Sequence, residues 1–411
     1  MVQNWDKIFE TLKTENIDAW MLINDGNKDP YYSKFVAPNT SVISVAIITQ
    51  NEVTIFVSSL EKELIEYYVN NATILVFSRK EKNTLNDLLI NFFNENPNIN
   101  TIALNYTTMN DVSVDTLGHG FYKYYTDLLI DNVHRITASN FVSAETIIYA
   151  LIDSKNDEDI KKMEIACNRA LNILDTAFKE IHAGMTELDV VELTHKITMR
   201  TRELFLNNYQ GEIVEETYSW EEENCPIVLT GKSFEKGGHA LSSNTIIEKG
   251  NTVYFDFGVT LTFSDGSSWS SDIQRTGYVL NDDETTAPIL IQNRFEDIID
   301  SISIGINNIK VGMKGCEVDK IVRNYLIDKG YPTYDHATGH AIGEMAHNPG
   351  TNLTSSEKGT GGLKIQPNGV YTIEPRIALE NGVSIEEMVV VRKNGQIETL
   401  CPRQTSIILI K

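Results

Sequence analysis

Three acidic residues in the second half of the chain stand inside apolar, β-rich stretches: Asp256, Glu374 and Glu386. A fourth acid, Asp272, stands in the polar run Ser270-Ser271-Asp272-Ile273-Gln274-Arg275-Thr276 shortly after Asp256. A carboxylate among apolar neighbours is costly unless it is paired, hydrogen-bonded or bound to a metal ion. For Asp256, in the run Val-Tyr-Phe-Asp-Phe-Gly, the alternative is a strand end at which the carboxylate already reaches solvent. The four acids are candidate metal ligands.

The segments around these acids predict how the acids could meet. Asp272 lies sixteen residues after Asp256, and Gly266 with the surrounding serines predicts a turn between them. Two strands of a hairpin could therefore hold both acids side by side. If the stretch around Glu386 is a strand, Glu386 and Glu387 point to opposite faces, so that one can face a site while the other is in water.

Histidines cluster shortly before Glu374. His336, His340 and His347 are three of the eight histidines in the chain. A His-x-x-x-His spacing on a helix can bind zinc, but Gly339 and Gly343 disfavour a helix, so we expect a loop or a strand. The histidines are either metal ligands or hydrogen-bonded structural imidazoles.

Four converging carboxylates and one imidazole would need positive charge beside them. Without cations the carboxylates repel one another and raise each other's pKa, whereas two divalent ions would balance their charge. Oxygen-rich ligation with one histidine suits Mn²⁺, Co²⁺ or Fe²⁺ at least as well as Zn²⁺. Carboxylates can bridge two ions about 3.5–4 Å apart, which is the arrangement that activates a water between them.

An internal repeat would position the acids. The segments Ile181–Met185 and Ile309–Met313 both place Gly-Met before an amphipathic helix pattern, and the offset from Gly184 to Gly312 is 128 residues. Each copy is later followed by a β-rich run that ends in one of the four acids. This pattern predicts two similar αβ halves with carboxylates at their junction. The predicted helices cover residues 187–203 and 316–329.

The rest of the chain indicates two domains. The chain has 411 residues, more than the roughly 250–300 residues of a single hydrophobic core. Residues 1–150 alternate between helix and strand patterns, which predicts an α/β domain with a central sheet. A long helical pattern follows Ser154, with Asn156 or Asp157 as its N-cap. We therefore expect domains at 1–153 and 154–411. The expected early elements are helices at Trp5–Glu15 and Glu61–Asn70 and strands at Ile17–Leu22, Val42–Ile48, Glu52–Val57 and Thr73–Phe77.

Charge and composition limit the classes of partner that this protein can bind. The formal net charge of −22 disfavours nucleic acid and anionic membrane, because both are bound through clustered Lys and Arg. No apolar run approaches the roughly 20 residues of a membrane span. The first residues show no basic start before an apolar stretch, so we expect a cytoplasmic protein. The four cysteines are scattered, without a Cys-x-x-Cys pair, and are expected to be reduced thiols.

In their order along the chain, these residues resemble the M24, or "pita-bread", metallopeptidases, which include Xaa-Pro aminopeptidases, prolidases and methionine aminopeptidases. The resemblance covers nearly the whole chain, and its N-terminal part favours the proline-specific branch. It implies a creatinase-like N-terminal α/β domain followed by a pita-bread catalytic domain with an internal pseudo-two-fold repeat. The matching motifs are Asp256-Phe257-Gly258, Ser271-Asp272-Ile273-Gln274-Arg275-Thr276, Gly339-His340-Ala341-Ile342-Gly343, Thr372-Ile373-Glu374-Pro375 and Ile385-Glu386.

The resemblance implies a role for each ligand. Asp256 would bind one ion, His340 and Glu374 the other, and Asp272 and Glu386 both. It implies two divalent ions per chain, Mn²⁺ first, with Co²⁺, Zn²⁺ or Fe²⁺ as alternatives. A metal-bridging hydroxide would attack the Xaa-Pro bond at a peptide N-terminus, and Glu374 would shuttle a proton. Proline-containing peptides and a second copy in a homodimer are the partners it implies.

Histidines outside the ligand set also match the pattern. His239 matches the family's histidine on the leaving-group side, and His347 matches the histidine that contacts the scissile carbonyl. Both are therefore candidates for catalysis and substrate binding. His336 matches a less defined position beside the ligands.

Two departures from the pattern concern substrate length. Arg376 follows Glu374-Pro375 where Gly is usual, and Ser384 stands where Arg is usual. A strict Xaa-Pro dipeptidase must hold the substrate's free carboxylate, which Arg does best. We therefore expect longer peptides to be preferred, unless Arg376 binds substrate in place of the missing guanidinium. The alternatives are a strict dipeptidase, a non-catalytic peptide-binding module, which would typically lose ligands, and a creatinase-like C–N hydrolase, which should lack the metal set.

Overall fold

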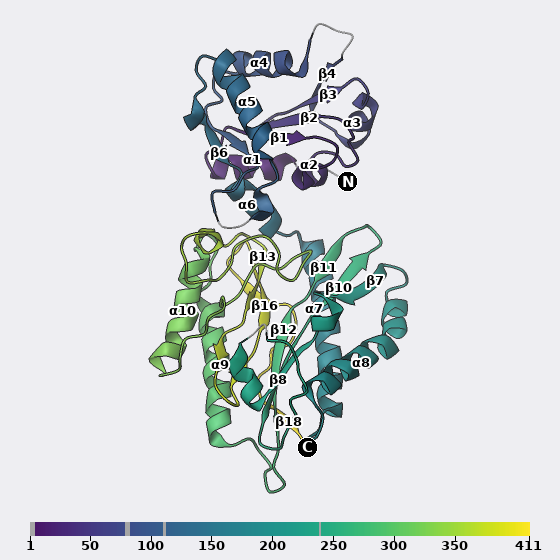
Figure 1. Ribbon diagram of the computed structural model, residues 1–411, viewed down its shortest axis with the longest axis vertical. Coiled ribbons are helices and arrows are strands. Elements are labelled where there is room, and N and C mark those ends of the chain that lie inside the picture. The colour runs from purple at the N-terminus through teal and green to yellow at the C-terminus, as the bar shows by residue number, and fades with distance from the viewer. Residues whose placement is uncertain (1–4, 79–82, 110–111, 238–239) are drawn as a thin grey trace. The chain divides into compact units, whose positions relative to one another are not determined.

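The computed structural model describes residues 5–78, 83–109, 112–237 and 240–411. The chain divides into two compact units, Met1–Leu151 and Ile152–Lys411, of which the first is coloured purple to blue and the second teal to yellow in Figure 1. No helix within the described ranges is both long and apolar enough to cross a membrane.

The first unit contains a six-stranded sheet in the order β4-β3-β2-β1-β5-β6. Leu89 of α4 and Leu129 of α5 pack with Ile47 and Phe56 on one face of this sheet. The expected α/β domain with a central sheet is confirmed, and each expected helix and strand is found with its ends within two residues. The elements are α1 (Trp5–Thr14), β1 (Ala19–Asn24), α2 (Pro30–Phe35), β2 (Ser44–Thr49), β3 (Val53–Ser58), α3 (Lys62–Tyr68), β4 (Thr73–Phe77), α4 (Leu85–Glu95), β5 (Ile102–Leu104), α5 (His119–Asn132), β6 (Phe141–Ser143) and α6 (Glu145–Asp153).

The second unit is built from small sheets between helices. Their strand orders are β18-β12-β9-β8, β11-β10-β7, β13-β16-β17 and β14-β15. The helices are α7 (Asp157–Glu180), α8 (Glu187–Asn208), α9 (Ile289–Asn308) and α10 (Gly315–Asp328). The strands are β7 (Ile213–Tyr218), β8 (Ile227–Thr230), β9 (Thr252–Phe257), β10 (Val259–Phe263), β11 (Ser268–Ser270), β12 (Ile273–Val279), β13 (Gly369–Ile373), β14 (Arg376–Ile377), β15 (Val383–Ser384), β16 (Glu387–Val391), β17 (Ile397–Thr399) and β18 (Ile408–Ile410).

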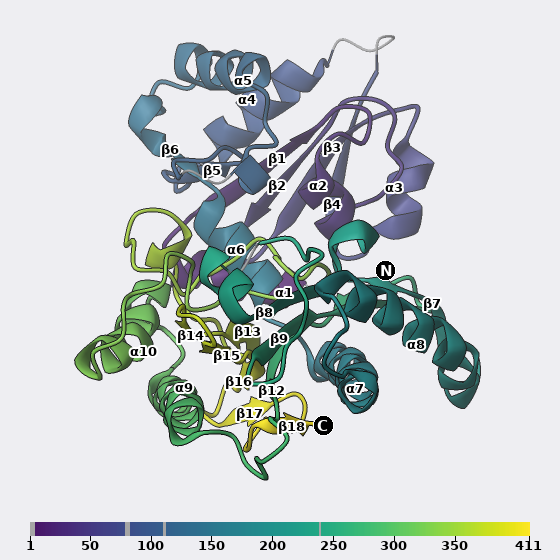
Figure 2. The same ribbon diagram turned by 60° about the horizontal axis from the view of Figure 1, so that its bottom comes forward.

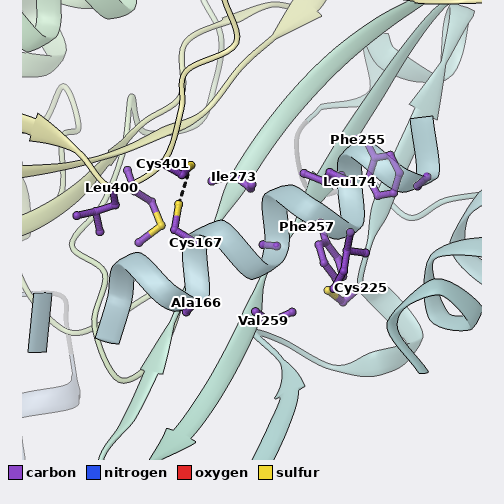
Figure 3. Packing of buried hydrophobic residues seen from close by; sticks show 14 of the residues in the cluster. Ala166, Cys167, Leu174, Cys225, Phe255, Phe257, Val259, Ile273, Leu400 and Cys401 are labelled. Atoms are coloured by element: carbon purple, nitrogen blue, oxygen red, sulfur yellow. Dashed lines mark hydrogen bonds between the residues drawn. The ribbon is translucent and has the colours of Figure 1, made fainter. Parts of the chain in front are cut away.

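Helix α7 begins where the sequence predicts and packs into the main core. The side chain of Asn156 caps it by accepting a hydrogen bond from the backbone N–H of Asp159. Figure 3 shows this helix lying against apolar side chains such as Phe255 of β9. All four cysteines are free thiols, as expected, and the Sγ atoms of Cys167 and Cys401 lie 2.9 Å apart in the same core.

The internal repeat is present in backbone detail. Gly184 has a φ of +96° and Gly312 a φ of +88°, a left-handed conformation that glycine adopts without strain. The N–H of Gly184 donates to the carbonyl of Ile247, and the N–H of Ile247 donates to the carbonyl of Met185. The second copy repeats both hydrogen bonds, from Gly312 to Ile365 and from Ile365 to Met313.

The helices of the two copies form matching pairs. Helix α7 packs on α8, and α9 packs on α10. The two pairs lie on opposite sides of the strands of this unit (Figures 1 and 2). The strands between the helix pairs therefore come from both halves of the repeat, and both halves can contribute side chains to one site.

Candidate metal centre

Strands β9 and β12 bring the first two acids together. They pair antiparallel with Gln274 opposite Asp256, and Asp272 immediately precedes β12. The chain between them forms the β10–β11 hairpin, whose turn contains Gly266 at a φ of +85°. The predicted turn is therefore present, but both acids lie outside this hairpin, Asp256 on β9 and Asp272 between β11 and β12.

The glycines of the motifs are required by close backbone contacts. A Cβ atom on Gly258 would lie 2.0 Å from the carbonyl oxygen of Ser271, and one on Gly339 would lie 2.0 Å from that of Thr372. The next residue, His340, exchanges hydrogen bonds with Thr372 of β13, which makes this segment extended. The expectation of a loop or strand here is confirmed.

The other two acids meet at one end of the β13–β16 pair. Glu374 directly follows β13, Glu386 directly precedes β16, and Ile373 pairs with Glu387 between the two strands. The N–H of Glu386 also donates to the carbonyl of Gln274, at 3.2 Å. This contact joins the second pair of acids to the strand that follows Asp272.

The predicted ligands converge around the Nε2 atom of His340. This atom lies 3.6 Å from Asp272 Oδ2, 3.6 Å from Glu374 Oε1 and 3.8 Å from Glu386 Oε1. The other ring nitrogen, Nδ1, lies 3.2 Å from the carbonyl of Ala341, which orients Nε2 toward the acids. Three overlapping groups hold ligand atoms within 4.8 Å of one another: Asp256 with Asp272 and Glu386, His340 with Glu374 and Glu386, and Asp272 with His340 and His347.

The four acids combine raised pKa values with carboxylate oxygens that lack donors, and bound cations would offset both. Burial raises the pKa of Asp256 to about 6, and burial with the charge of Asp256 raises that of Glu374 to about 8. Burial and neighbouring acids raise the pKa of Asp272 and of Glu386 well above the usual range. Asp256 Oδ1 and both carboxylate oxygens of Glu386 are buried without a hydrogen-bond donor among the described residues. Divalent ions would satisfy these oxygens and restore the ionised carboxylates.

A second layer of side chains holds the acids. The hydroxyl of Tyr254 donates to Asp256 Oδ2 at 2.9 Å, and the amide of Gln274 donates to Glu374 Oε2 at 2.9 Å. The sequence interpretation assigned no role to these two residues. One signal was available, because Gln274 is a polar residue in an otherwise matched motif within β12, and every residue of that strand is buried.

The structure corrects the interpretation of Glu387. We expected one of Glu386 and Glu387 to reach water, but Glu387 is fully buried. Its Oε2 atom lies 3.3 Å from Nη2 of Arg275, and its Oε1 atom accepts from the N–H of Gln404 at 3.0 Å. A second layer of chain covers that face of the strand, so alternation places Glu387 in a buried ion pair.

The remaining predicted residues differ in their placement. His347 is exposed, and its ring centroid lies 4.4 Å from that of His340. His336 is in none of the three ligand groups, and its ring lies against Tyr334. His239 lies outside the described residues.

Arg376 is buried beside the centre. Its guanidinium lies 3.8 Å from the ring centroid of Phe234 and 4.9 Å from that of Tyr254. Nη2 donates to the carbonyl of Phe234 at 2.6 Å, whereas Nε and Nη1 have no hydrogen-bond partner among the described residues. Burial lowers the pKa of this guanidinium. Across the β14–β15 pair, Arg376 stands opposite Ser384.

The site defines a class of protein: three buried carboxylates, the largely buried Glu374 and an imidazole, drawn from two repeated halves, form a carboxylate-rich group that could hold metal ions for hydrolysis. Comparison with known proteins agrees. The model of metallopeptidase family M24 matches residues 161–393, more than half of the chain. The chain therefore belongs to metallopeptidase family M24, which confirms the predicted metallopeptidase.

Relatives extend the similarity beyond the catalytic unit. The uncharacterised peptidase YqhT of Bacillus subtilis is 33% identical over 161 residues, which span 38% of this chain and 41% of that protein. A Xaa-Pro dipeptidase of Pyrococcus horikoshii is 24% identical over 395 residues, 95% of this chain and 94% of that protein. The crystal structure of an X-Pro aminopeptidase from Thermotoga maritima is 20% identical with a TM-score of 0.60, covering 98% of this chain and 100% of the other. The expected fold, an α/β unit followed by a pita-bread unit, is confirmed.

Proposed function

We propose that this chain is a dinuclear metal-dependent peptidase that hydrolyses the Xaa-Pro bond at the N-terminus of peptides. The observation that carries the proposal is a cluster of four carboxylates with raised pKa values, three of which lie within 3.8 Å of His340 Nε2, in a chain of family M24. The proposed ligands are Asp256 for one ion, His340 and Glu374 for the other, and Asp272 and Glu386 for both.

The bound ions would supply Lewis acidity and activate a water molecule. The chain's own residues would do the rest. Glu374, whose Oε1 faces His340, would hold and pass a proton. His347, exposed beside His340, would stabilise the oxyanion that develops on the scissile carbonyl. His239 is proposed to act on the leaving-group side.

Specificity for proline is proposed from the relatives. The Pyrococcus horikoshii relative is named a Xaa-Pro dipeptidase, and the Thermotoga maritima structure is that of an X-Pro aminopeptidase. Proline lacks an N–H and has a restricted φ, so a site must accept its ring by shape.

We further propose that peptides longer than two residues are preferred. The hydroxyl of Ser384, at the position where arginine is usual, is occupied by donating to Gln274 Oε1 at 2.8 Å. Arg376 is 1% exposed and its guanidinium contacts two aromatic rings, so it does not stand at a surface where a substrate carboxylate arrives from solvent.

The alternative is a strict Xaa-Pro dipeptidase in which Arg376 binds the substrate carboxylate. The observation that favours it is the pair of donors, Nε and Nη1, that lack partners among the described residues. These two nitrogens lie on different edges of the guanidinium, and each could donate a hydrogen bond to a carboxylate. The non-catalytic binding module is not favoured, because every predicted metal ligand within the described residues lies in the cluster.

One experiment separates these proposals. Metal-free protein is reloaded with Mn²⁺ or Co²⁺, and kcat/KM is measured for Ala-Pro, Ala-Pro-Ala and longer Xaa-Pro peptides. We expect no turnover without metal and a higher kcat/KM for the longer peptides. Full activity in verified metal-free protein would refute the metallopeptidase mechanism, and a higher kcat/KM for Ala-Pro would refute the aminopeptidase assignment.

The role of Arg376 is tested by Arg376→Ala. In the dipeptidase alternative, this change removes a preference for Ala-Pro over Ala-Pro-Ala. Arg403→Ala is the matched control, since Arg403 Nη2 contacts Ile299 and Ser303 of α9 and lies at none of the predicted ligands.

Two ions per chain, Mn²⁺ as the preferred ion, a homodimer and a cytoplasmic location stay predictions.

A further inference from the structure

Gln274 is placed between the two halves of the proposed metal centre. Its backbone pairs with Asp256 through the β9–β12 ladder and with Glu386 through an isolated bridge. Its side-chain Nε2 lies 2.9 Å from Glu374 Oε2 and 3.4 Å from Asp256 Oδ2. Asp256 follows the first copy of the repeat and Glu374 the second, so one amide contacts an acid from each half.

The orientation of this amide is determined by a third residue. The hydroxyl of Ser384 lies 2.8 Å from Gln274 Oε1 and donates to it. With its oxygen occupied, the amide must present its N–H groups to the carboxylates, because a flipped amide would place oxygen against oxygen. Gln274 is 4% exposed, so water does not readily replace these contacts.

The amide also distinguishes the two oxygens of each acid. In Glu374 the amide donates a hydrogen bond to Oε2, whereas Oε1 faces Nε2 of His340 at 3.6 Å. In Asp256 the amide and the Tyr254 hydroxyl both donate hydrogen bonds to Oδ2, whereas Oδ1 is buried without a donor among the described residues. One oxygen of each acid is thus held by the protein, and the other is left for a cation.

We propose that Gln274 is a positioning residue of the metal centre, which holds Asp256 and Glu374 at the separation that two cations require. The proposal rests on the proposed metal site but not on any particular substrate. An outer hydrogen bond of this kind orients a ligand before the metal arrives, and its loss typically weakens metal binding about 10- to 100-fold. Because the amide contacts acids proposed to bind different ions, its removal should weaken both binding steps.

The test compares two buried glutamines. Gln274→Met keeps the approximate volume and removes the donor. Gln404→Met is the matched control, because the side chain of Gln404 bonds to the backbone of Thr276 and Ser406 and contacts none of the proposed ligands. Metal-free wild type and variants are titrated with Mn²⁺ against a chromophoric chelator, and urea unfolding of the metal-free forms is measured in parallel.

We expect the Mn²⁺ dissociation constants of Gln274→Met to rise about 10- to 100-fold, while those of Gln404→Met stay at the wild-type value. If the two metal-free variants lose the same free energy of unfolding, weaker Mn²⁺ binding in Gln274→Met alone reflects positioning of the acids and not general destabilisation. Wild-type dissociation constants in a folded Gln274→Met would overturn the inference. If wild type itself binds no Mn²⁺, the proposed metal centre fails instead.

A second variant keeps the inference testable if Gln274→Met does not fold. Ser384→Ala removes the hydroxyl that orients the amide and leaves Gln274 in place. We expect it to raise the same dissociation constants by a smaller factor, because the amide can then rotate away from the acids. Unchanged Mn²⁺ binding in Ser384→Ala beside an unfolded Gln274→Met would also overturn the inference.

Discussion

Removing metal should make the stability of this protein fall as the pH rises, and the cause is the cluster of buried acids. Glu374 has a pKa of about 8 in the folded chain without a cation, against an ordinary value of 4.5. Below pH 4.5 this acid is protonated in both the folded and the unfolded chain. Between pH 4.5 and 8 the unfolded chain releases a proton that the folded site retains. The free energy of unfolding therefore decreases through this window and is lowest above it.

The magnitude follows from the two pKa values. The difference between 4.5 and about 8 corresponds to roughly 5 kcal/mol, since one pH unit is about 1.4 kcal/mol. Part of that shift is repulsion from Asp256, so the contribution of Asp256 is not added separately. For a domain of about 150–250 residues, 1 kcal/mol changes Tm by roughly 2–4 °C. The catalytic unit should therefore lose about 10–20 °C in Tm between pH 4.5 and 8 relative to a site without this acid.

The assay is thermal unfolding of chelator-treated wild type and of Glu374→Gln, a variant that keeps the shape but cannot ionise. We expect equal Tm values near pH 4.5 and a progressively higher Tm for the metal-free variant toward pH 8. Excess Mn²⁺ should reverse the order at pH 8, because only wild type keeps the full set of ligands. Parallel pH profiles for the two metal-free proteins would refute the reasoning.

Three further substitutions test the site and its supports. Asp272→Ala should lose at least one bound ion and nearly all turnover, and two ions per chain with normal kcat would show that this acid does not bridge. Glu387→Leu should lower the free energy of unfolding by about 3–5 kcal/mol in urea titrations, because it leaves the buried Arg275 without its charged partner; a change below 1 kcal/mol would contradict that pairing. Gly258→Ala should cost about 3 kcal/mol or more, because its new Cβ would lie 2.0 Å from the carbonyl of Ser271. A wild-type Tm for this last variant would exclude the close contact.

Much of the fold is encoded locally in the sequence. Asn156 caps α7 because its side chain accepts from an N–H three residues ahead, a contact that depends on nothing distant. Gly184 and Gly312 identify the repeat because both turns require a left-handed backbone. The early strands and helices follow from hydrophobic periodicity, and their ends are within two residues of prediction.

The ligand residues are also apparent in the sequence, because acids in apolar runs have few inexpensive explanations. That argument identifies Asp256, Glu374 and Glu386, while Asp272 follows from its spacing to Asp256, and the structure brings all four together with His340. Their assignment to particular ions stays a proposal.

The tertiary structure alone decided the surroundings of the acids. Strand alternation predicts that Glu386 and Glu387 face opposite ways, but it does not tell whether the second face is covered by other parts of the chain. Arg275, on a strand more than a hundred residues earlier, covers that face. The contacts of Gln274 with Glu374 and Ser384 likewise join residues a hundred or more positions apart. Residue type and backbone preference act over a few neighbours, whereas burial and hydrogen-bond partners depend on which strands pair, and that pairing is a property of the whole chain.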